Sequence, residues 1–212
     1  MWSPPPDAPY LPTKAQIQRI LAPHQTITER NACQHYVSHT RRPVWIRTCY
    51  APDLEDACQE IFKAAQGEIG LNLILDDESL YGHFEQDWTR VFLRVPLLLE
   101  HALFYNNEDP EDDGTQISFP PPDDEEKLPL YDAVKRCRSF HYLLDEEALR
   151  EQLVKVQYLD IQGQPVWYNK IRPDQIEYFE AHPGGGALSA RFEFCEDDRA
   201  LLQPGALLDL DP

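Results

Sequence analysis

The stretch from Leu153 to Arg172 constrains the fold more than any other part of this chain of 212 residues. Polar and apolar side chains alternate from Val154 to Tyr158, with the period of two that is typical of a half-buried strand, and alternate again after Pro165. Between these runs, Asp160 to Gln164 supplies a turn in which Gly163 is free to adopt positive φ. We therefore predict a β-hairpin, and with it a fold built on a sheet.

A second pattern, between residues 44 and 75, predicts a pair of parallel strands. Residues 44–50 and 71–75 are rich in β-forming side chains, and apolar residues recur at helical spacing between them, from Asp53 to Gly67. We expect Asp53 to cap this helix. A strand, a helix and a strand make a βαβ unit with parallel strands. The sequence thus predicts an α/β to α+β domain: one mixed sheet with a βαβ start and an antiparallel hairpin, and helices packed on it.

The N-terminal part of the chain has a different character. Residues 1–12 are rich in proline and show no periodicity, so we expect a flexible arm. Thr13 and Thr26 each begin a capping box followed by apolar residues at helical spacing. Residues 13–42 are therefore predicted to form a helical extension in front of the main domain, which spans 43–198.

An acidic segment interrupts the main domain. Residues 106–129 are dominated by Asp and Glu and contain three consecutive prolines, a composition that cannot build a core. We expect a disordered acidic insertion here. A helix near Leu130 to Cys137 and a strand at 139–144 follow it. Further on, a last strand is expected at 188–194, and residues 199–212 are interpreted as a tail.

Charge and cysteine content narrow the possible partners. The formal net charge is −18 and the isoelectric point is near 4.6, which argues against direct binding to nucleic acid or to an anionic membrane surface. The five cysteines show no metal-ligand spacing, and the chain starts without an apolar leader. We expect a cytoplasmic protein with reduced thiols, and a basic protein partner would suit its charge.

Two acidic clusters follow predicted strands and suggest one possible chemistry. Asp76 and Asp77 follow the strand at 71–75, while Asp145 and Glu146 follow the strand at 139–144. If both strands are parallel in one sheet, these carboxylates emerge at the edge where α/β sheets place their ligands, and they would suit Mg²⁺ or Mn²⁺. The alternative is that each Asp caps a helix and each Glu complements the helix dipole.

Nucleophilic catalysis has weaker support in the sequence. Cys49 and His141 offer a thiol and a base, but each lies inside a predicted strand, where a thiol usually behaves as a small apolar side chain. No GxSxG elbow is present.

Aromatic and arginine side chains suggest a binding surface. Trp167 lies on the opposite phase of its strand from Val166 and Tyr168, so one of these two sets faces outward unless helices cover both faces of the sheet. Trp45 has a similar place in its own strand. An exposed tryptophan beside Arg172 or Arg47 would anchor a protein partner, because Trp and Arg are frequent interface hot spots. Burial of both tryptophans under helices is the alternative.

Two blocks of the chain also share features with a known family. The first block runs from Ile46-Arg47-Thr48 through the acid-led helix at 53–65 to Asp76-Asp77. The second runs from Phe140-His141-Tyr142-Leu143-Leu144-Asp145 through the hairpin to Ile171-Arg172-Pro173, then Ile176-Glu177, Leu188-Ser189-Ala190 and Phe192-Glu193-Phe194.

Together these blocks resemble a family of uncharacterised small acidic domains, found mainly in actinobacteria and occasionally in fungi. The chain departs from the family pattern at Cys49-Tyr50, where an acidic and aromatic pair is usual, and at 175–186, where a Trp and an Asn pair are usual. The resemblance implies an α/β domain and no activity.

Taken together, these features favour a non-catalytic cytosolic interaction module with a protein partner and no cofactor. The alternative is a hydrolase or phosphoryl-transfer enzyme that depends on a divalent metal, Mg²⁺ or Mn²⁺, held by the carboxylates at the strand ends.

Overall fold

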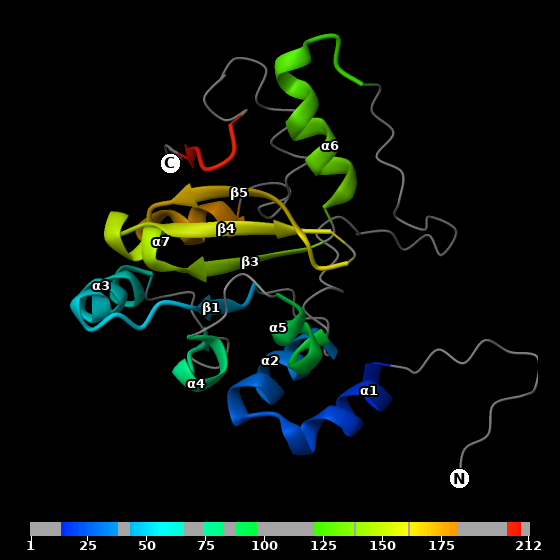
Figure 1. The fold of residues 1–212 in the computed structure, drawn as a ribbon, viewed down its shortest axis with the longest axis vertical. Helices are drawn as coiled ribbons and strands as arrows, with labels where there is room; N and C mark the ends of the chain where they lie inside the picture. The colour runs from blue at the N-terminus through cyan, green and yellow to red at the C-terminus, as the bar shows by residue number, and fades with distance from the viewer. Residues whose placement is uncertain are drawn as a thin grey trace, which may run out of the picture.

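A six-stranded mixed sheet organises the protein (Figure 1). The computed structural model describes residues 14–37, 43–65, 74–82, 88–96, 121–137, 139–160, 162–181 and 203–208. The strands follow the order β2-β1-β3-β4-β5-β6, with bounds β1 Trp45–Arg47, β2 Ile74–Leu75, β3 Ser139–Leu144, β4 Val154–Leu159, β5 Pro165–Ile171 and β6 Leu207–Leu208. The predicted fold class, a single mixed sheet with packed helices, is confirmed.

Helices pack on both faces of the sheet. Their bounds are α1 Lys14–Leu21, η1 Ala22–His24, α2 Ile27–Val37, η2 Pro52–Leu54, α3 Glu55–Ala64, α4 Glu78–Tyr81, α5 Trp88–Arg94, η5 Glu125–Lys127, α6 Leu128–Arg136, α7 Glu146–Glu151, η6 Pro173–Gln175 and α8 Ile176–Ala181. Figure 1 shows α2, α4 and α5 grouped on the far side of β1 from α6. None of the described helices is long and apolar enough to cross a membrane.

The parallel half of the sheet is the predicted βαβ unit. Strand β1 lies between β2 and β3 and runs parallel to both, with Trp45 opposite Ile74 on one side and Tyr142 on the other. Strand β1 is shorter than predicted because its neighbour β3 ends at Leu144. The last hydrogen bond between the two segments runs from the Thr48 N–H to the Leu144 carbonyl.

The predicted cap at Asp53 is wrong. The chain enters α3 through the 3₁₀ turn η2, with Pro52 in its first turn, and Leu54 at the helix N-cap makes no side-chain hydrogen bond. A proline at this position already fixes φ near the helical value, so the helix starts without an Asp cap. The Asp53 carboxylate instead lies 3.7 Å from Arg150 of α7.

The antiparallel half contains the predicted hairpin, which is confirmed in detail. Strands β4 and β5 pair with Tyr158 opposite Trp167, and Pro165 begins β5. Gly163 has a φ of +77°, as its place in the turn requires. The Asp160 carboxylate accepts hydrogen bonds from the backbone N–H groups of residues 162 and 164, so this one side chain shapes the turn.

Two apolar cores flank the sheet. On one face, α3, α6 and α8 cover side chains from β1, β3, β4 and β5, among them Tyr142, Val156 and Trp167. On the other face, α2, α4 and α5 cover Ile46 and Leu143 together with Leu75 and Leu159. Within the described residues, this second core covers β2, β1 and β3 and reaches only Leu159 of the hairpin.

A buried carboxylate joins the N-terminal helices to the domain. Glu29 of α2 is fully buried, and its oxygens accept hydrogen bonds from Arg94 Nε at 2.5 Å, Arg94 Nη2 at 2.8 Å and the Tyr81 hydroxyl at 2.6 Å. The backbone N–H of Thr26 also donates to it, as the predicted capping box requires. Gln25 donates to the Arg94 carbonyl. The extension therefore packs as part of the domain.

Two segments differ from the boundaries that the sequence suggested. The last part of the acidic segment, residues 121–129, is ordered: Asp124 accepts from the N–H of Glu126 and starts η5, which leads directly into α6. In the tail, residues 203–208 turn through Gly205 and add β6 to the edge of β5. The predicted helix near Leu130 is confirmed as α6. It begins two residues earlier than predicted, at Leu128, because a proline at position 129 suits the first turn of a helix.

Several predicted segments lie outside the described residues. They are the proline-rich arm at 1–12, the rest of the acidic insertion at 106–120, and the strand at 188–194.

Replacing Glu29 by alanine should destabilise the protein strongly. The change leaves Arg94 and the buried Tyr81 hydroxyl without their shared acceptor, which costs roughly 2–4 kcal/mol of unfolding free energy. Urea unfolding of Glu29→Ala and wild type measures this difference.

The matched control is Glu60→Ala, on the exposed surface of α3, which should stay within about 0.5 kcal/mol of wild type. A cost at Glu29 no larger than the cost at Glu60 would contradict the role assigned to this carboxylate.

Candidate functional site

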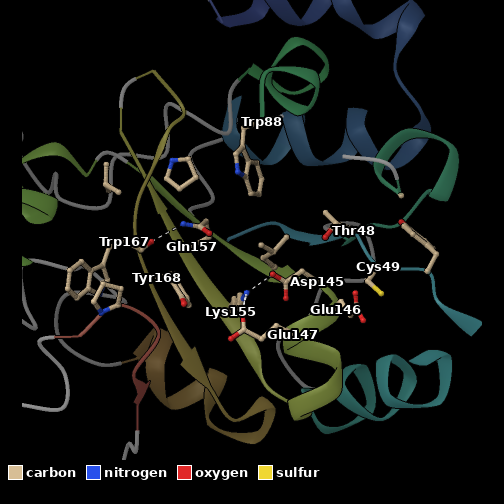
Figure 2. Close-up of a pocket in the computed structure, with 16 residues that line it drawn as sticks. Thr48, Cys49, Trp88, Asp145, Glu146, Glu147, Lys155, Gln157, Trp167 and Tyr168 are labelled. Atoms are coloured by element: carbon tan, nitrogen blue, oxygen red, sulfur yellow. Dashed lines mark hydrogen bonds and ion pairs between the residues drawn. The ribbon is translucent and has the colours of Figure 1, made fainter. Parts of the chain in front are cut away.

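A hollow of about 830 Å³ opens on the sheet face that the second core leaves uncovered among the described residues. Lys155, Gln157 and Tyr168 of the hairpin line it, together with Leu143 of β3 (Figure 2). Its rim comes from residues 48–50 after β1, the start of α7, and α5. The volume lies in the range of about 300–1,000 Å³ that is usual for ligand pockets.

Strand alternation decides which side chains of β4 reach the hollow. Val154, Val156 and Tyr158 pack into the core beneath α3, α6 and α8, so Lys155 and Gln157 point to the opposite face. Both are nevertheless buried, each with 8 % of its surface exposed. A buried ammonium group and a buried amide must be paired, and the surrounding residues provide partners.

A network of ion pairs holds the two lysines of the hairpin. The Lys155 ammonium lies 2.6 Å from Asp145 and 2.5 Å from Glu147. The Lys170 ammonium lies 2.7 Å from the other oxygen of Glu147 and 2.7 Å from Glu151. Helix α7 thus neutralises two cations on neighbouring strands with carboxylates from its own first and last turns.

The network fixes the charge of its members near neutral pH. Burial alone would lower the pKa of Lys155, but its hydrogen bonds to Asp145 and Glu147 outweigh burial and raise the pKa. Hydrogen bonds from Lys155 and Lys170 lower the pKa of Glu147 to about 2. Neither group changes its protonation state near pH 7, so neither suits general acid or base catalysis there.

The amide of Gln157 has a defined orientation in the hollow. Its nitrogen donates to the Trp167 carbonyl at 2.9 Å, and because a carbonyl can only accept, the oxygen must occupy the other position. Figure 2 shows this bond running from Gln157 to the neighbouring strand, with the side chain among the residues that line the hollow. Among the described residues, no donor is bonded to the Gln157 oxygen.

His141 lies beside the hollow but does not open into it. It has 1 % of its surface exposed and packs against the Trp88 ring with centroids 4.5 Å apart. Burial lowers the pKa of His141 to about 3, and its Nε2 atom has no partner among the described residues. Cys49 lines the hollow without a hydrogen bond to this histidine, so the structure does not assemble them as a nucleophile and base.

The two tryptophans predicted as exposed anchors are buried. Trp45 has 3 % and Trp167 has 4 % of its surface exposed. Trp45 packs against Phe62 of α3, and Trp167 belongs to the core that α6 and α8 cover. The prediction of an exposed tryptophan is wrong, because helices cover the face of the sheet towards which Trp45 and Trp167 point. The alternate residues of β5, which are Val166, Tyr168 and Lys170, are the half-exposed ones.

The two arginines also differ in their surroundings. Arg47 is buried, with Glu55 of α3 at 2.5 Å and Asp76 at 3.6 Å, and its guanidinium lies 4.5 Å from the centre of the Tyr50 ring. It therefore ties β1 to its neighbours and offers no surface to a partner. Arg172 is exposed at the end of β5 and does not line the hollow.

The four carboxylates proposed as metal ligands are engaged separately. Asp77 accepts from the N–H of Ser79 and caps α4, while Asp145 accepts from Ala148 and caps α7. Asp76 faces Arg47, and one oxygen of Glu146 accepts both hydrogen bonds from Arg150. Within the part of the chain that the structure describes, no group of three or more ligating side chains is suited to a metal ion. Helix capping is therefore observed at Asp77 and Asp145, whereas Asp76 and Glu146 pair with arginines.

The fold and the hollow define a mixed α/β protein with a polar cavity on one sheet face. No protein-family model, curated protein or solved structure matches the chain. The resemblance to small acidic actinobacterial and fungal domains stays a prediction, and function must be inferred from the residues of the hollow.

His141 should make the protein sensitive to acid. In the unfolded chain this imidazole binds a proton below about pH 6.5, but the buried ring resists protonation until about pH 3, so unfolding is favoured as the pH falls between these values. The loss has a slope of up to about 1.4 kcal/mol per pH unit. Unfolding of wild type and His141→Phe at pH 7 and pH 5 measures it.

The variant should lose less stability than wild type between the two pH values, since phenylalanine keeps the contact with Trp88 without a titrating group. His24→Phe, at an exposed position, serves as the control and should follow wild type. Equal losses in all three proteins would contradict a buried neutral His141.

Glu147 should give a second acid-sensitive contribution in a lower window. Its folded pKa of about 2 lies below the ordinary value of 4.5, so the stabilisation is complete above about pH 4.5 and disappears as the pH falls towards 2. The side chain is 45 % exposed, so solvent screening keeps the effect modest. Glu147→Gln should be less stable than wild type at pH 6, and this gap should close by pH 2.5 in denaturant titrations. A constant gap would disprove the assignment.

Proposed function

We propose that this protein is a non-catalytic, cytosolic interaction module that binds a protein partner in the hollow over β4 and β5. The observation that carries the proposal is the arrangement of Lys155 and Lys170, whose charges are satisfied by carboxylates of Asp145, Glu147 and Glu151. Such a surface is pre-organised, because its side chains already have fixed positions before a ligand arrives. It therefore supports binding better than proton transfer.

The pKa values of the described groups point the same way. Burial raises the pKa of the Cys33 and Cys58 thiols to about 11, and it lowers that of His141 to about 3. A catalytic acid, base or thiol works best with a pKa near the working pH. These shifts move the groups away from neutrality, as expected for structural positions.

Charge and thiol state support the remaining parts of the proposal. The net charge of −18 favours encounter with a basic partner through long-range attraction. Among the described residues, Cys33, Cys49, Cys58 and Cys137 form no disulfide, which fits a reducing compartment such as the cytosol.

The proposal is tested by blocking the hollow. Thr48→Trp adds an indole at the rim, and we expect proteins that co-purify with the wild-type chain from cells expressing it to be lost. Quantitative mass spectrometry of the captured proteins measures the loss, and a thermal melt establishes that the variant is folded.

The control variant is Glu177→Trp, which adds the same indole to an exposed position of α8, on the other face of the sheet. It should retain the partners. Identical captured sets from all three baits would sink the proposal.

A further inference from the structure

We propose that the hollow binds an arginine side chain of a basic protein partner, with its guanidinium donating to the amide oxygen of Gln157. This inference rests on the proposed function and names the chemistry of the ligand. Three independent features of the hollow lead to it: its unused acceptors, its residual charge and the depth at which one acceptor lies.

The unused hydrogen-bonding atoms of the hollow are mainly acceptors. Gln157 has 8 % of its surface exposed, and the bond from its side-chain nitrogen to the Trp167 carbonyl leaves its oxygen for a ligand. At the rim, both hydrogen bonds from Arg150 go to Oε1 of Glu146, so Oε2 remains available. Both oxygens can accept hydrogen bonds, and a ligand rich in N–H groups would donate to them in place of water.

The charges around the hollow leave an excess of negative charge. The charged side chains that line the hollow are Asp145, Glu146, Glu147 and Lys155, so three carboxylates accompany one cation among the described residues. The excess of two negative charges favours a cation. An anionic ligand would meet Glu146 at the entrance, and Lys155, the one cation among the described lining residues, is already paired with Asp145 and Glu147.

The depth of Gln157 favours arginine over lysine. To reach this oxygen the cation must give up much of its water, and a guanidinium is more weakly hydrated than an ammonium group. A guanidinium also presents several N–H donors in one plane and packs well against aromatic rings, and Trp88 lines the same hollow.

The ion-pair network explains why the Lys155 ammonium does not itself donate to the Gln157 oxygen. Its ammonium is held by Asp145 at 2.6 Å and by Glu147 at 2.5 Å, and it lies 5.2 Å from the centre of the Tyr168 ring. It is thereby directed towards α7. The Gln157 oxygen two residues further along β4 stays available.

The experiment is a titration of the isotope-labelled full chain, followed by NMR, with the peptide acetyl-Gly-Arg-Gly-amide. Citrulline in place of arginine gives a neutral peptide of nearly the same shape, and lysine gives the other cation. We expect the arginine peptide to shift the signals of Gln157 and Thr48, and to bind at least about tenfold more tightly than the citrulline peptide. The lysine peptide should bind more weakly than the arginine peptide.

Two variants and a matched control locate the interaction. Glu146→Gln should weaken arginine binding about three- to tenfold, and Gln157→Leu should weaken it at least as much, each with a melting temperature recorded to establish folding. Glu177→Gln makes the same change in net charge on α8 and should leave binding unchanged. If Glu177→Gln weakens binding as much as Glu146→Gln does, attraction is non-specific and the inference is overturned.

Other outcomes also decide the matter. Equal affinity for the citrulline and arginine peptides would overturn the assignment of a cation, and tighter binding of agmatine than of the peptide would overturn the assignment to a protein partner. The proposed function fails separately: if Thr48→Trp abolishes partner capture while the arginine peptide does not bind, the hollow is an interaction site and only its ligand has been misassigned.

Discussion

The unequal covering of the two sheet faces determines most of what is distinctive in this structure. On one face, helices α3, α6 and α8 cover strands across the sheet, and the strands direct large apolar side chains towards them. On the other face, the described helices cover β2, β1 and β3. The hairpin carries the polar residues Lys155, Gln157 and Lys170 on this face, where apolar side chains would need a helix to cover them. Polar side chains at these positions keep the hairpin compatible with water, but their partial burial requires partners.

Helix α7 supplies those partners, and this explains the acidic sequence at its start. Asp145 caps the helix with one oxygen and holds Lys155 with the other. Glu147 bridges Lys155 and Lys170. Carboxylates in a first turn also complement the helix dipole, so one short acidic run serves local helix formation and the packing of the hairpin together. The acidic run after β3 is therefore explained without a metal.

The N-terminal helices contribute to the hollow from a distance. Glu29 of α2 binds Arg94 at the end of α5, and Gln25 binds the Arg94 carbonyl. Helix α5 begins with Trp88, which packs on His141 and lines the hollow. The position of one wall thus depends on a buried ion pair formed by a segment that resembles a separate extension in the sequence.

Local patterns predicted the elements whose causes are local. The hairpin, the strand at 139–144, the cap at Asp145 and the capping box at Thr26 depend on residues within a few positions of each other, and all are confirmed. Strand β6 could not be predicted, because two residues carry no period and the strand exists through its pairing with β5.

The candidate site depended on information that alternation alone does not contain. The pattern around Trp167 correctly separated two sets of side chains, but which set is covered depends on where α6 and α8 pack. The same pattern in β4 placed Lys155 and Gln157 on one face, and this was the available signal for the hollow. Asp76 resembled a metal ligand because its partner, Arg47, is distant in sequence and meets it only through the pairing of β1 with β2.

The distinction between binding and catalysis follows from how the charges of the hollow are satisfied. A catalytic carboxylate or lysine must exchange protons during each turnover, and strong ion pairs make that exchange costly. Here Lys155 and Glu147 stabilise each other's charged forms, so they hold a fixed electrostatic surface around the acceptors of Gln157 and Glu146. The excess of carboxylates around these acceptors favours a cation over a neutral molecule of the same shape, and the acceptors add direct hydrogen bonds. Binding then requires no rearrangement of the lysine pairs, because the acceptors that the ligand would use are the ones that the network leaves open.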